Sequence, residues 1–381
     1  QGPTLLEGRL PDPASGVSHS TYDGPMHSHP SSSPPTDGTP YSSLTPDIVI
    51  DALDSVGLRG DGRLIQLNSY ENRVYQAFLE DGRAVVTKFY RPGRWTTEQI
   101  LEEHAFANEL VAQEIPVVPA MTLAIDTYSR IPIELLGDPS TLARLSGDDS
   151  GHYRFAVAER HGGRAPELDD AETLQWLGRF IGRLHVVGAQ RPFLHRQRFD
   201  VAQVRSACRD WLLDQKLIPE DLESAWRDTC DQALDTAQRV FDALPETRSI
   251  RLHGDCHLGN VLWTPAGPHF VDLDDACMGP AIQDLWMLLS GDRSAMTWQL
   301  GELLAGYEDF REFDWREMRL VEPLRTLRIV HHSAWLARRW DDPAFPVAFP
   351  WFGTAAYWGE QITRLRDQID AMAEPALFQP G

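Results

Sequence analysis

The sequence predicts an α+β protein of two lobes, in which a small β-rich lobe precedes a larger, mostly helical lobe. Three observations lead to this fold class. Strand-like runs with turn signals fill residues 64–90, the apolar pattern changes to a helical period after Gly162, and 381 residues with 42% apolar content allow a large core. We expect a disordered tail at residues 1–44, an N-terminal lobe at 45–160 and a C-terminal lobe at 161–381.

The N-terminal lobe is expected to begin after a stretch rich in Pro, Ser, Gly and Thr, a composition that predicts disorder. In "TPDIVIDALDSVGL", Thr45 is placed to cap a short helix that starts at Pro46. The runs "LIQLNSYENRVYQAFL" and "RAVVTKFY" flank the turn "EDGR", which predicts a β-hairpin. An amphipathic helix is predicted for "TTEQILEEHAFANELVAQE", and its core-facing residues are Ile100, Leu101, Phe106 and Leu110.

Further strands and then helices complete the outline. The runs "PVVPAM" and "YRFAVAE" predict strands, and the polar residues 126–150 between them are expected to form a loop, to which we assign no role. The run "DDAETLQWLGRFIGRLHVVG" begins with acidic capping residues and predicts a helix with one apolar face, formed by Leu174, Leu177, Ile181 and Leu184. Another helical pattern covers "WREMRLVEPLRTLRIVHHSAWLARRW".

Charge and cysteine content exclude some classes of protein. A net charge of −21 argues against a nucleic-acid or anionic-membrane partner, so a phosphate-bearing ligand needs local cations or a metal ion. No stretch has the length of a membrane span, and the first residues lack the pattern of a signal peptide. The four cysteines form no CxxC pair, which favours a reducing, cytoplasmic setting. A monomer is the default expectation.

Polar residues between two apolar runs form the strongest chemical signal. Asp255 and Asn260 stand five positions apart in "RLHGDCHLGNVLW", the separation of the base Asp and the metal-binding Asn in the catalytic loop of protein kinases. At this spacing the Asp can reach an incoming hydroxyl while the Asn amide oxygen meets a Mg²⁺ on nucleotide phosphates. Twelve residues after Asn260, the run "PHFVDLDDA" brings Asp272 to the end of a second strand-like segment, where a second metal-binding carboxylate is needed.

Lysine is rare in this chain, and one lysine stands where phosphotransfer needs it. Of the 35 basic residues only Lys88 and Lys216 are lysines. Lys88 lies inside the apolar strand "AVVTKFY", where an unpaired ammonium is costly. We therefore expect nucleotide phosphates and a carboxylate from the following helix as its partners.

These motifs together resemble a known family. "LHGDCHLGNVLW" followed by "FVDLDDACMGPAIQDLW" is similar to the catalytic region of the aminoglycoside phosphotransferase and choline kinase superfamily, which has a protein-kinase-like fold. "LNSYENRVYQ", "KFYRPGRWTTEQILEEH" and "AWLARRWDDPAFPVAFPW" resemble the stress response kinase A family of bacterial Ser/Thr protein kinases. The resemblance covers about residues 45 to 375.

The resemblance implies ATP as co-substrate, Mg²⁺ as cofactor and a protein Ser or Thr hydroxyl as acceptor, with autophosphorylation. It implies Asp255 as the catalytic base and Asn260 and Asp272 as metal ligands, Asp272 thereby also serving catalysis. The implied nucleotide-binding residues are Ser69 in a phosphate-covering loop, Lys88, its ion-pair partner Glu103, and Glu159 and Arg160 at the adenine hinge. Glu98 and Glu102 lie on the same helix as Glu103 and are the alternative partners of Lys88.

Two departures from simpler kinase patterns are visible. The loop around Ser69 has no glycines, so backbone and hydroxyl donors must cover the phosphates. Asp272 is followed by Leu-Asp rather than Phe-Gly, which argues against a movable switch at this point. For Asp274 and Asp275, a second cation site and a loop-capping or solvated role remain equal alternatives.

Competing interpretations of the same residues were weighed. A zinc site in "HGDCH" is disfavoured because structural zinc needs about four N or S ligands at recognised spacings. Cys256 lacks an opposed base that would make it a nucleophile, and His253 and His257 are expected to orient the loop. Segment 335–358 is expected to pack in the core and at the edge of a lobe, with binding of a protein substrate as the minority alternative.

Three functions compete at this stage. The first is a protein Ser/Thr kinase, which the family-specific motifs favour. The second is a small-molecule kinase of the aminoglycoside, choline or homoserine type, because the same loop serves those substrates. The third is a nucleotide-binding module without turnover, which the complete set of Lys88, Asp255, Asn260 and Asp272 disfavours.

Overall fold

A computed structural model describes residues 40–127, 129–146 and 153–377. The chain divides into residues 1–36 and 37–381, and every described residue belongs to the second unit. Most of the expected tail, residues 1–39, therefore lies outside the described residues. Within the described part, no helix combines the length and apolar character needed to cross a membrane.

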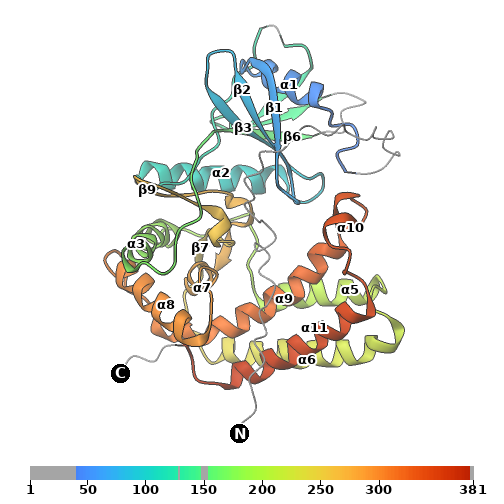
Figure 1. The fold of residues 1–381 in the computed structure, drawn as a ribbon, viewed down its shortest axis with the longest axis vertical. Helices are drawn as coiled ribbons and strands as arrows, with labels where there is room; N and C mark the ends of the chain where they lie inside the picture. The colour runs from blue at the N-terminus through green and yellow to red at the C-terminus, as the bar shows by residue number, and fades with distance from the viewer. Residues whose placement is uncertain (1–39, 128, 147–152, 378–381) are drawn as a thin grey trace, which may run out of the picture. The chain divides into compact units, whose positions relative to one another are not determined.

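The N-terminal lobe is built on one antiparallel sheet of six strands in the order β1-β2-β3-β6-β5-β4 (Figure 1). The strands are β1 (Gly60–Leu67), β2 (Arg73–Leu79), β3 (Ala84–Phe89), β4 (Ile133–Leu136), β5 (Leu142–Leu145) and β6 (Arg154–Glu159). The predicted β2–β3 hairpin is confirmed, and Lys88 of β3 is paired with Val74 on one side and Ala156 on the other. Lys88 is thus held in the interior of the sheet.

Two helices accompany this sheet. Helix α1 (Pro46–Ser55) has Thr45 as its N-cap and Pro46 in its first turn, as the sequence predicts. Helix α2 (Thr97–Ala112) begins with a capping box between Thr96 and Gln99, which satisfies two backbone N–H groups at the helix start. Its predicted core face is confirmed, because Ile100, Phe106 and Leu110 are buried and Leu101 is partly buried.

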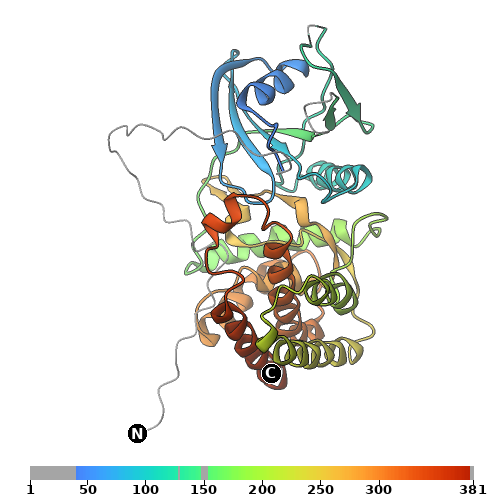
Figure 2. The ribbon, with the colours of Figure 1, turned by 90° about the vertical axis from the view of Figure 1, so that its right-hand side faces the viewer.

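The C-terminal lobe is mostly helical (Figures 1 and 2). Its helices are α3 (Ala171–Gly188), α4 (Val201–Val204), the π-helical turn η1 (Arg205–Asp210), α5 (Trp211–Asp214), α6 (Glu220–Asp242), α7 (Ile282–Trp286), α8 (Arg293–Tyr307), α9 (Val321–Ala337), α10 (Ala344–Ala348) and α11 (Ala355–Ala373), with 3₁₀ turns η2 (Leu258–Asn260), η3 (Leu273–Asp275) and η4 (Trp315–Leu320). Two small antiparallel pairs lie among them: β7 (Ile250–Leu252) with β10 (Cys277–Gly279), and β8 (Val261–Thr264) with β9 (Gly267–Phe270).

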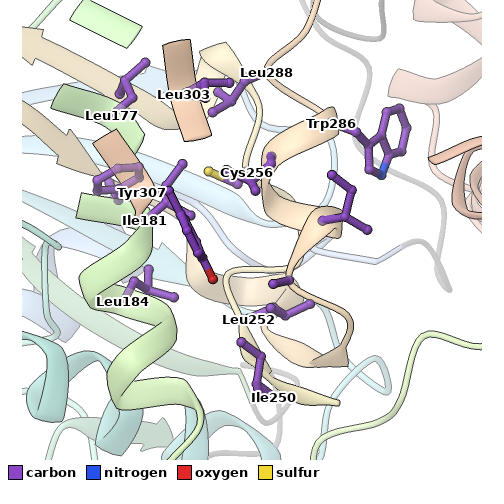
Figure 3. Close-up of a cluster of buried hydrophobic side chains, with 14 of the residues drawn as sticks. Leu177, Ile181, Leu184, Ile250, Leu252, Cys256, Trp286, Leu288, Leu303 and Tyr307 are labelled. Carbon is purple, nitrogen blue, oxygen red and sulfur yellow. The ribbon is translucent and has the colours of Figure 1, made fainter. Parts of the chain in front are cut away.

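The predicted apolar face of α3 anchors the C-terminal core. Leu174, Leu177, Ile181 and Leu184 are all buried in one cluster with β7 and α8. Figure 3 shows Leu177, Ile181 and Leu184 in one apolar cluster with Ile250 and Leu252 of β7, from which the loop with Asp255 starts. The loop with Asp255 thus starts from a strand that is packed into the core of the C-terminal lobe.

The structure corrects three expectations. Tyr41 and Leu44, assigned to the tail, are buried in the N-terminal lobe, where Tyr41 stacks on Tyr153 with ring centroids 5.7 Å apart. Residues 126–150, expected to be a loop, contain β4 and β5, which pair with each other because the chain reverses at residues 137–141. The run "PVVPAM" forms only isolated bridges, Val117 with Phe270 and Ala120 with Ala158, since it passes between the lobes rather than along one sheet.

Candidate active site

The loop that carries Asp255 runs from β7 to η2 and is fixed by a buried carboxylate. Asp284 of α7 accepts hydrogen bonds from the backbone N–H groups of His253 (2.8 Å) and Gly254 (2.9 Å). His185 Nε2 lies 3.1 Å from the same carboxylate, which is completely buried. Gly254 has φ +86°, and a Cβ there would lie 2.1 Å from the carbonyl oxygen of Asp275, so only glycine fits. The position of Asp255 is therefore set by the main chain on its N-terminal side.

Asp255 is surrounded by cationic and hydrogen-bonding groups. Arg328 Nη1 lies 2.9 Å from Asp255 Oδ1, and His257 Nε2 lies 3.4 Å from Oδ2. Burial by itself raises the pKa of Asp255, but Arg328, His257 and His253 outweigh burial and hold this pKa well below its usual range. Asp255 is therefore ionised at neutral pH, as a proton acceptor must be.

The Asp255 loop and the Asp272 loop are joined by hydrogen bonds. The Asn260 side-chain amide donates to the carbonyl oxygen of Asp255 (2.9 Å), and the Val271 N–H donates to the carbonyl oxygen of Asn260 (3.0 Å). His253 Nε2 lies 3.0 Å from the carbonyl oxygen of Val271, in keeping with its expected orienting role. Because the Asn260 nitrogen is used as a donor, its amide oxygen is the atom that remains for a cation.

Asp272 directly follows this junction and contacts Lys88. Asp272 has φ +62°, a left-handed conformation that non-glycine residues seldom adopt outside constrained sites. Its Oδ1 lies 2.8 Å from Lys88 Nζ. Burial alone lowers the pKa of Lys88. The carboxylates of Asp272 and Asp274 outweigh burial and raise this pKa well above its usual value, so the ammonium is charged at neutral pH.

In this structure Lys88 pairs with Asp272 rather than with Glu103, the partner expected on α2. Burial raises the pKa of Glu103 to about 7, so ionising it is costly, whereas the Asp272 side chain is 49% exposed. Lys88 still acts on Glu103 and lowers its pKa. Glu102 is used elsewhere, because its carboxylate accepts the N–H groups of Leu194, His195 and Arg196.

The loop around Ser69 is shaped by side chains instead of glycines. Ser69 Oγ accepts the N–H of Asn72 (3.3 Å), and the Asn72 amide donates to Asp274 Oδ2 (3.0 Å). Arg94 contacts Asp274 (2.9 Å), Asp275 (2.5 Å) and Glu71 (3.3 Å). This one guanidinium therefore links the Ser69 loop to the segment after Asp272. Asp274 and Asp275 are engaged by arginine, which favours the structural alternative over a second cation site.

A cluster that we call the interlobe clamp extends this linkage to the C-terminal lobe. It consists of Glu71, Arg73, Arg91 and Arg94 on one side and Trp335, Arg339 and Asp342 on the other. Asp342 lies 3.1 Å from Arg73 and 2.9 Å from Arg91. Glu71 lies 2.5 Å from Arg339 and accepts the Trp335 indole N–H at 2.7 Å.

Aromatic rings cover the clamp. Tyr70 packs on Phe345 and Phe349, with centroids 6.0 and 5.0 Å apart. In both ribbon views α10 lies at the end of the helical lobe nearest the sheet (Figures 1 and 2). Segment 335–349 therefore packs between the lobes, which agrees with its expected place at the edge of a lobe.

Glu159 and Arg160 lie where β6 ends and the chain leaves for the C-terminal lobe. Glu159 is paired with Val85 of β3, three positions before Lys88, and the Arg160 N–H donates to the carbonyl oxygen of Ala84 (3.2 Å). Both side chains are exposed. Glu159 and Arg160, the expected hinge residues, thus lie at the end of β6, the strand that pairs with the strand of Lys88. Neither side chain contacts Asp255, Asn260 or Asp272.

The thiol and zinc alternatives receive no support. The Cys256 sulfur lies in the apolar cluster with Leu288 and Leu303 (Figure 3), and burial raises the pKa of this thiol well above its usual value. All four cysteines are buried and unpaired. In the described part of the chain, no cluster of three or more His, Cys, Asp or Glu residues has the arrangement of a metal site.

Sequence reasoning missed the supporting residues Asp284, Arg94, Asn72 and Arg328. Asp284 had a visible signal, because it is a single carboxylate within the apolar run "AIQDLWMLL". A charge in such a run must be buried with partners. The other three had no local signal, since their contacts with Asp274 and Asp255 join residues about 70 to 200 positions apart in the chain.

Comparison with known proteins decides the family. Residues 63–321 match the model of the phosphotransferase enzyme family. Over 337 residues, the chain is 43% identical to stress response kinase A of Escherichia coli, covering 88% of this chain and 96% of that protein. The chain belongs to the stress response kinase A family. The same identity and coverage hold for the Serine/threonine protein kinase RdoA of Salmonella typhimurium.

Membership of this family makes the chain an ATP-dependent phosphotransferase. Solved structures of low sequence identity confirm the fold. The amicoumacin kinase hAmiN, in complex with AMP-PNP, Ca²⁺ and Ami, superposes with a TM-score of 0.63 at 19% identity, covering 88% of this chain and 96% of that one. A microcompartment-associated aminopropanol kinase also gives a TM-score of 0.63, at 18% identity, covering 86% and 96%. The predicted two-lobed, kinase-like fold is thus confirmed.

Proposed function

We propose that this phosphotransferase is a Ser/Thr protein kinase that acts in bacterial stress responses and also phosphorylates itself. The observation that carries the proposal is the 43% identity, over 88% of the chain, to relatives named stress response kinase A and Serine/threonine protein kinase RdoA. The unpaired, buried cysteines suit the cytoplasmic setting that the sequence predicts.

Asp255 is the proposed base. Its carboxylate takes the proton of the acceptor hydroxyl while the hydroxyl oxygen bonds to the γ-phosphorus and the bond from that phosphorus to ADP breaks. The Asp284 anchor and Gly254 hold the Asp255 backbone, so the carboxylate needs little reorganisation during the reaction. Lys88 supplies the ammonium that offsets the charge of the phosphates.

Asn260 and Asp272 are the proposed Mg²⁺ ligands. Their donor atoms fit this ion, because an amide oxygen and a carboxylate are both hard oxygen donors, and nucleotide phosphates and water complete such a shell. When bound, Mg²⁺ neutralises charge on the β- and γ-phosphates. Ser69, Glu103, Glu159 and Arg160 are the proposed nucleotide-side residues around Lys88. Lys88 Nζ contacts Oδ1 of Asp272, so Oδ2 is the oxygen with which Asp272 would hold the ion.

A small-molecule kinase is the second candidate. Structures with the same fold include an aminopropanol kinase and a spectinomycin phosphotransferase, the latter with a TM-score of 0.52 at 13% identity. The fold therefore accommodates small alcohols as well as proteins.

Transfer from γ-labelled ATP separates the candidates. The 381-residue chain is incubated with labelled ATP and Mg²⁺, alone, with a generic protein substrate, and with choline, homoserine or an aminoglycoside. Label on the chain itself and on the protein substrate is the expected result. Label on small alcohols alone would reject the protein-kinase proposal, and Asp255→Asn serves as the inactive control.

A further inference from the structure

The cation beside the proposed base comes from the C-terminal lobe. Arg328 lies on α9, and its Nη1 is 2.9 Å from Asp255 Oδ1 and 3.8 Å from the sulfur of Met287. The Arg328 side chain is 30% exposed, so a ligand can reach it. Oδ1 of Asp255 is buried and accepts no aligned hydrogen bond from a described residue, although the two groups are in ion-pair contact. The Asp255 side chain as a whole is 22% exposed, so a hydroxyl can reach the carboxylate through its other oxygen, Oδ2.

The other charged groups near the base are compensated or neutral. Asp275, which acts electrostatically on Asp255, is bound by Arg94 at 2.5 Å. On α9, burial and Arg328 depress the pKa of His331 to about 3 and that of His332 to about 4, so both rings are neutral at neutral pH. Among the described residues around Asp255, Arg328 is thus an accessible guanidinium, whereas the Asp275 carboxylate, although 41% exposed, is already paired with Arg94.

We propose that Arg328 selects the acceptor by charge, so that phosphate is transferred to hydroxyls that stand beside an anionic group. When the acceptor hydroxyl bonds to Asp255, the carboxylate interacts less strongly with the Arg328 guanidinium. A carboxylate or phosphate next to the hydroxyl then accepts two parallel N–H bonds from Arg328. An ammonium beside the hydroxyl is repelled instead and finds no carboxylate to hold it. The strongly acidic total charge of the chain does not alter this local preference, because exposed charges farther than about 10 Å are screened.

This inference rests on the proposed function only in taking a peptide as the natural acceptor. It then specifies the peptide: a Ser or Thr followed or preceded by Asp, Glu or a phosphorylated residue. It also predicts that cationic alcohols such as choline and aminoglycosides are poor acceptors for this chain, although other proteins of this fold use alcohols.

The test measures kcat/KM for matched Ser peptides whose flanking residues are Asp, phosphoserine, Ala or Lys. Two small acceptors, choline and the anionic hydroxy acid glycerate, are measured beside them. The 381-residue chain is compared with Arg328→Gln, Arg328→Glu and Arg325→Gln. Arg325 is one turn earlier on α9 and bonds to Glu322 (2.9 Å), so its variant controls for loss of an arginine from this helix. Thermal unfolding checks that each variant folds, and Arg328→Gln is the milder change if Arg328→Glu does not.

We expect the unmodified chain to favour Asp-flanked or phosphoserine-flanked peptides over Lys-flanked ones by roughly tenfold, the effect of one ion pair worth about 1.4 kcal/mol. Arg328→Gln should remove this ratio, Arg328→Glu should invert it, and Arg325→Gln should leave it unchanged. The relative rates with Asp and phosphoserine identify which anion is preferred.

The possible failures are distinguishable. Peptide transfer without charge preference, or an equal loss for all acceptors in Arg328→Gln, overturns the inference and leaves the protein-kinase proposal standing. Transfer to glycerate but to no peptide, with the same dependence on Arg328, rejects the protein substrate and supports the charge selection. Preferred transfer to choline overturns both.

Discussion

Replacing Asp284 by Asn should separate the anchoring of the catalytic loop from its chemistry. The Asp284 carboxylate accepts from His253 N, Gly254 N and His185 Nε2 at 2.8, 2.9 and 3.1 Å. An asparagine keeps one acceptor oxygen, but its NH₂ group must face one of these donors. A buried donor without an acceptor costs about 1–3 kcal/mol, and the remaining bonds lose the carboxylate charge. We expect a loss of about 3 kcal/mol in the free energy of unfolding.

Activity should fall as well, because Gly254 directly precedes Asp255. A displacement of the base by about 1 Å can lower kcat by roughly 10²-fold. The affinity for ATP should change much less, since Asp284 contacts no nucleotide-side residue. Urea unfolding followed by tryptophan fluorescence gives the stability, and phosphotransfer and nucleotide titration give the other two quantities.

Asp292→Asn is the matched control for this experiment. Asp292 is an exposed carboxylate that caps α8 by accepting the N–H of Ala295 (2.8 Å). The same substitution there should cost about 1 kcal/mol or less and leave turnover unchanged. If Asp284→Asn is as stable and active as Asp292→Asn, the anchoring role assigned to Asp284 is refuted.

Three further predictions follow from the described contacts. Asp255→Asn should lower turnover by roughly 10²-fold with little change in ATP affinity, whereas Asp272→Asn should lower turnover and also weaken Mg²⁺-dependent ATP binding. Titration with a non-hydrolysable ATP analogue measures that binding, and loss of binding in Asp255→Asn but not in Asp272→Asn would show that the two roles are exchanged. Burial raises the pKa of Glu317 from 4.5 to about 7, so its contribution to stability is complete below pH 4.5 and is lost as the pH rises through 7. The free energy of unfolding of Glu317→Gln, taken relative to wild type, should therefore rise by up to about 3 kcal/mol between pH 5 and pH 8. If this difference in unfolding free energy is the same at both pH values, the prediction is contradicted. Tyr41→Ala should cost about 3 kcal/mol of unfolding free energy, and a loss below about 1 kcal/mol would place Tyr41 outside the core.

Local patterns in the sequence predicted much of the scaffold. The Thr45 cap, the β2–β3 hairpin and the apolar face of α3 depend on residues close together in the chain, where propensity and periodicity act directly. The spacing of Asp255 and Asn260 was informative for the same reason, because one short loop carries both side chains. Their catalytic and metal-binding roles stay predictions.

Features that depend on distant partners could not be predicted. Strands β4 (Ile-Glu-Leu-Leu) and β5 (Leu-Ala-Arg-Leu) are four residues each and each contain a single charged residue, so both are too short to show a clear alternation. The contact of Glu71 with Arg339 joins residues 268 positions apart, and no local pattern encodes it. Tyr41 follows a Pro- and Ser-rich stretch that suggested disorder, but its ring is buried against residues of the sheet.

The interlobe clamp has a consequence for how the two substrates influence each other. Helix α9 carries Arg328 beside the proposed base, and near its end Trp335 contacts Glu71 of the Ser69 loop. If that loop shifts on nucleotide binding, the same helix would carry the shift to the surroundings of Asp255. Binding free energies coupled in this way are reciprocal, so the factor by which ATP changes acceptor affinity must equal the factor by which the acceptor changes ATP affinity. Loosening the clamp at Asp342 should bring that common factor closer to one.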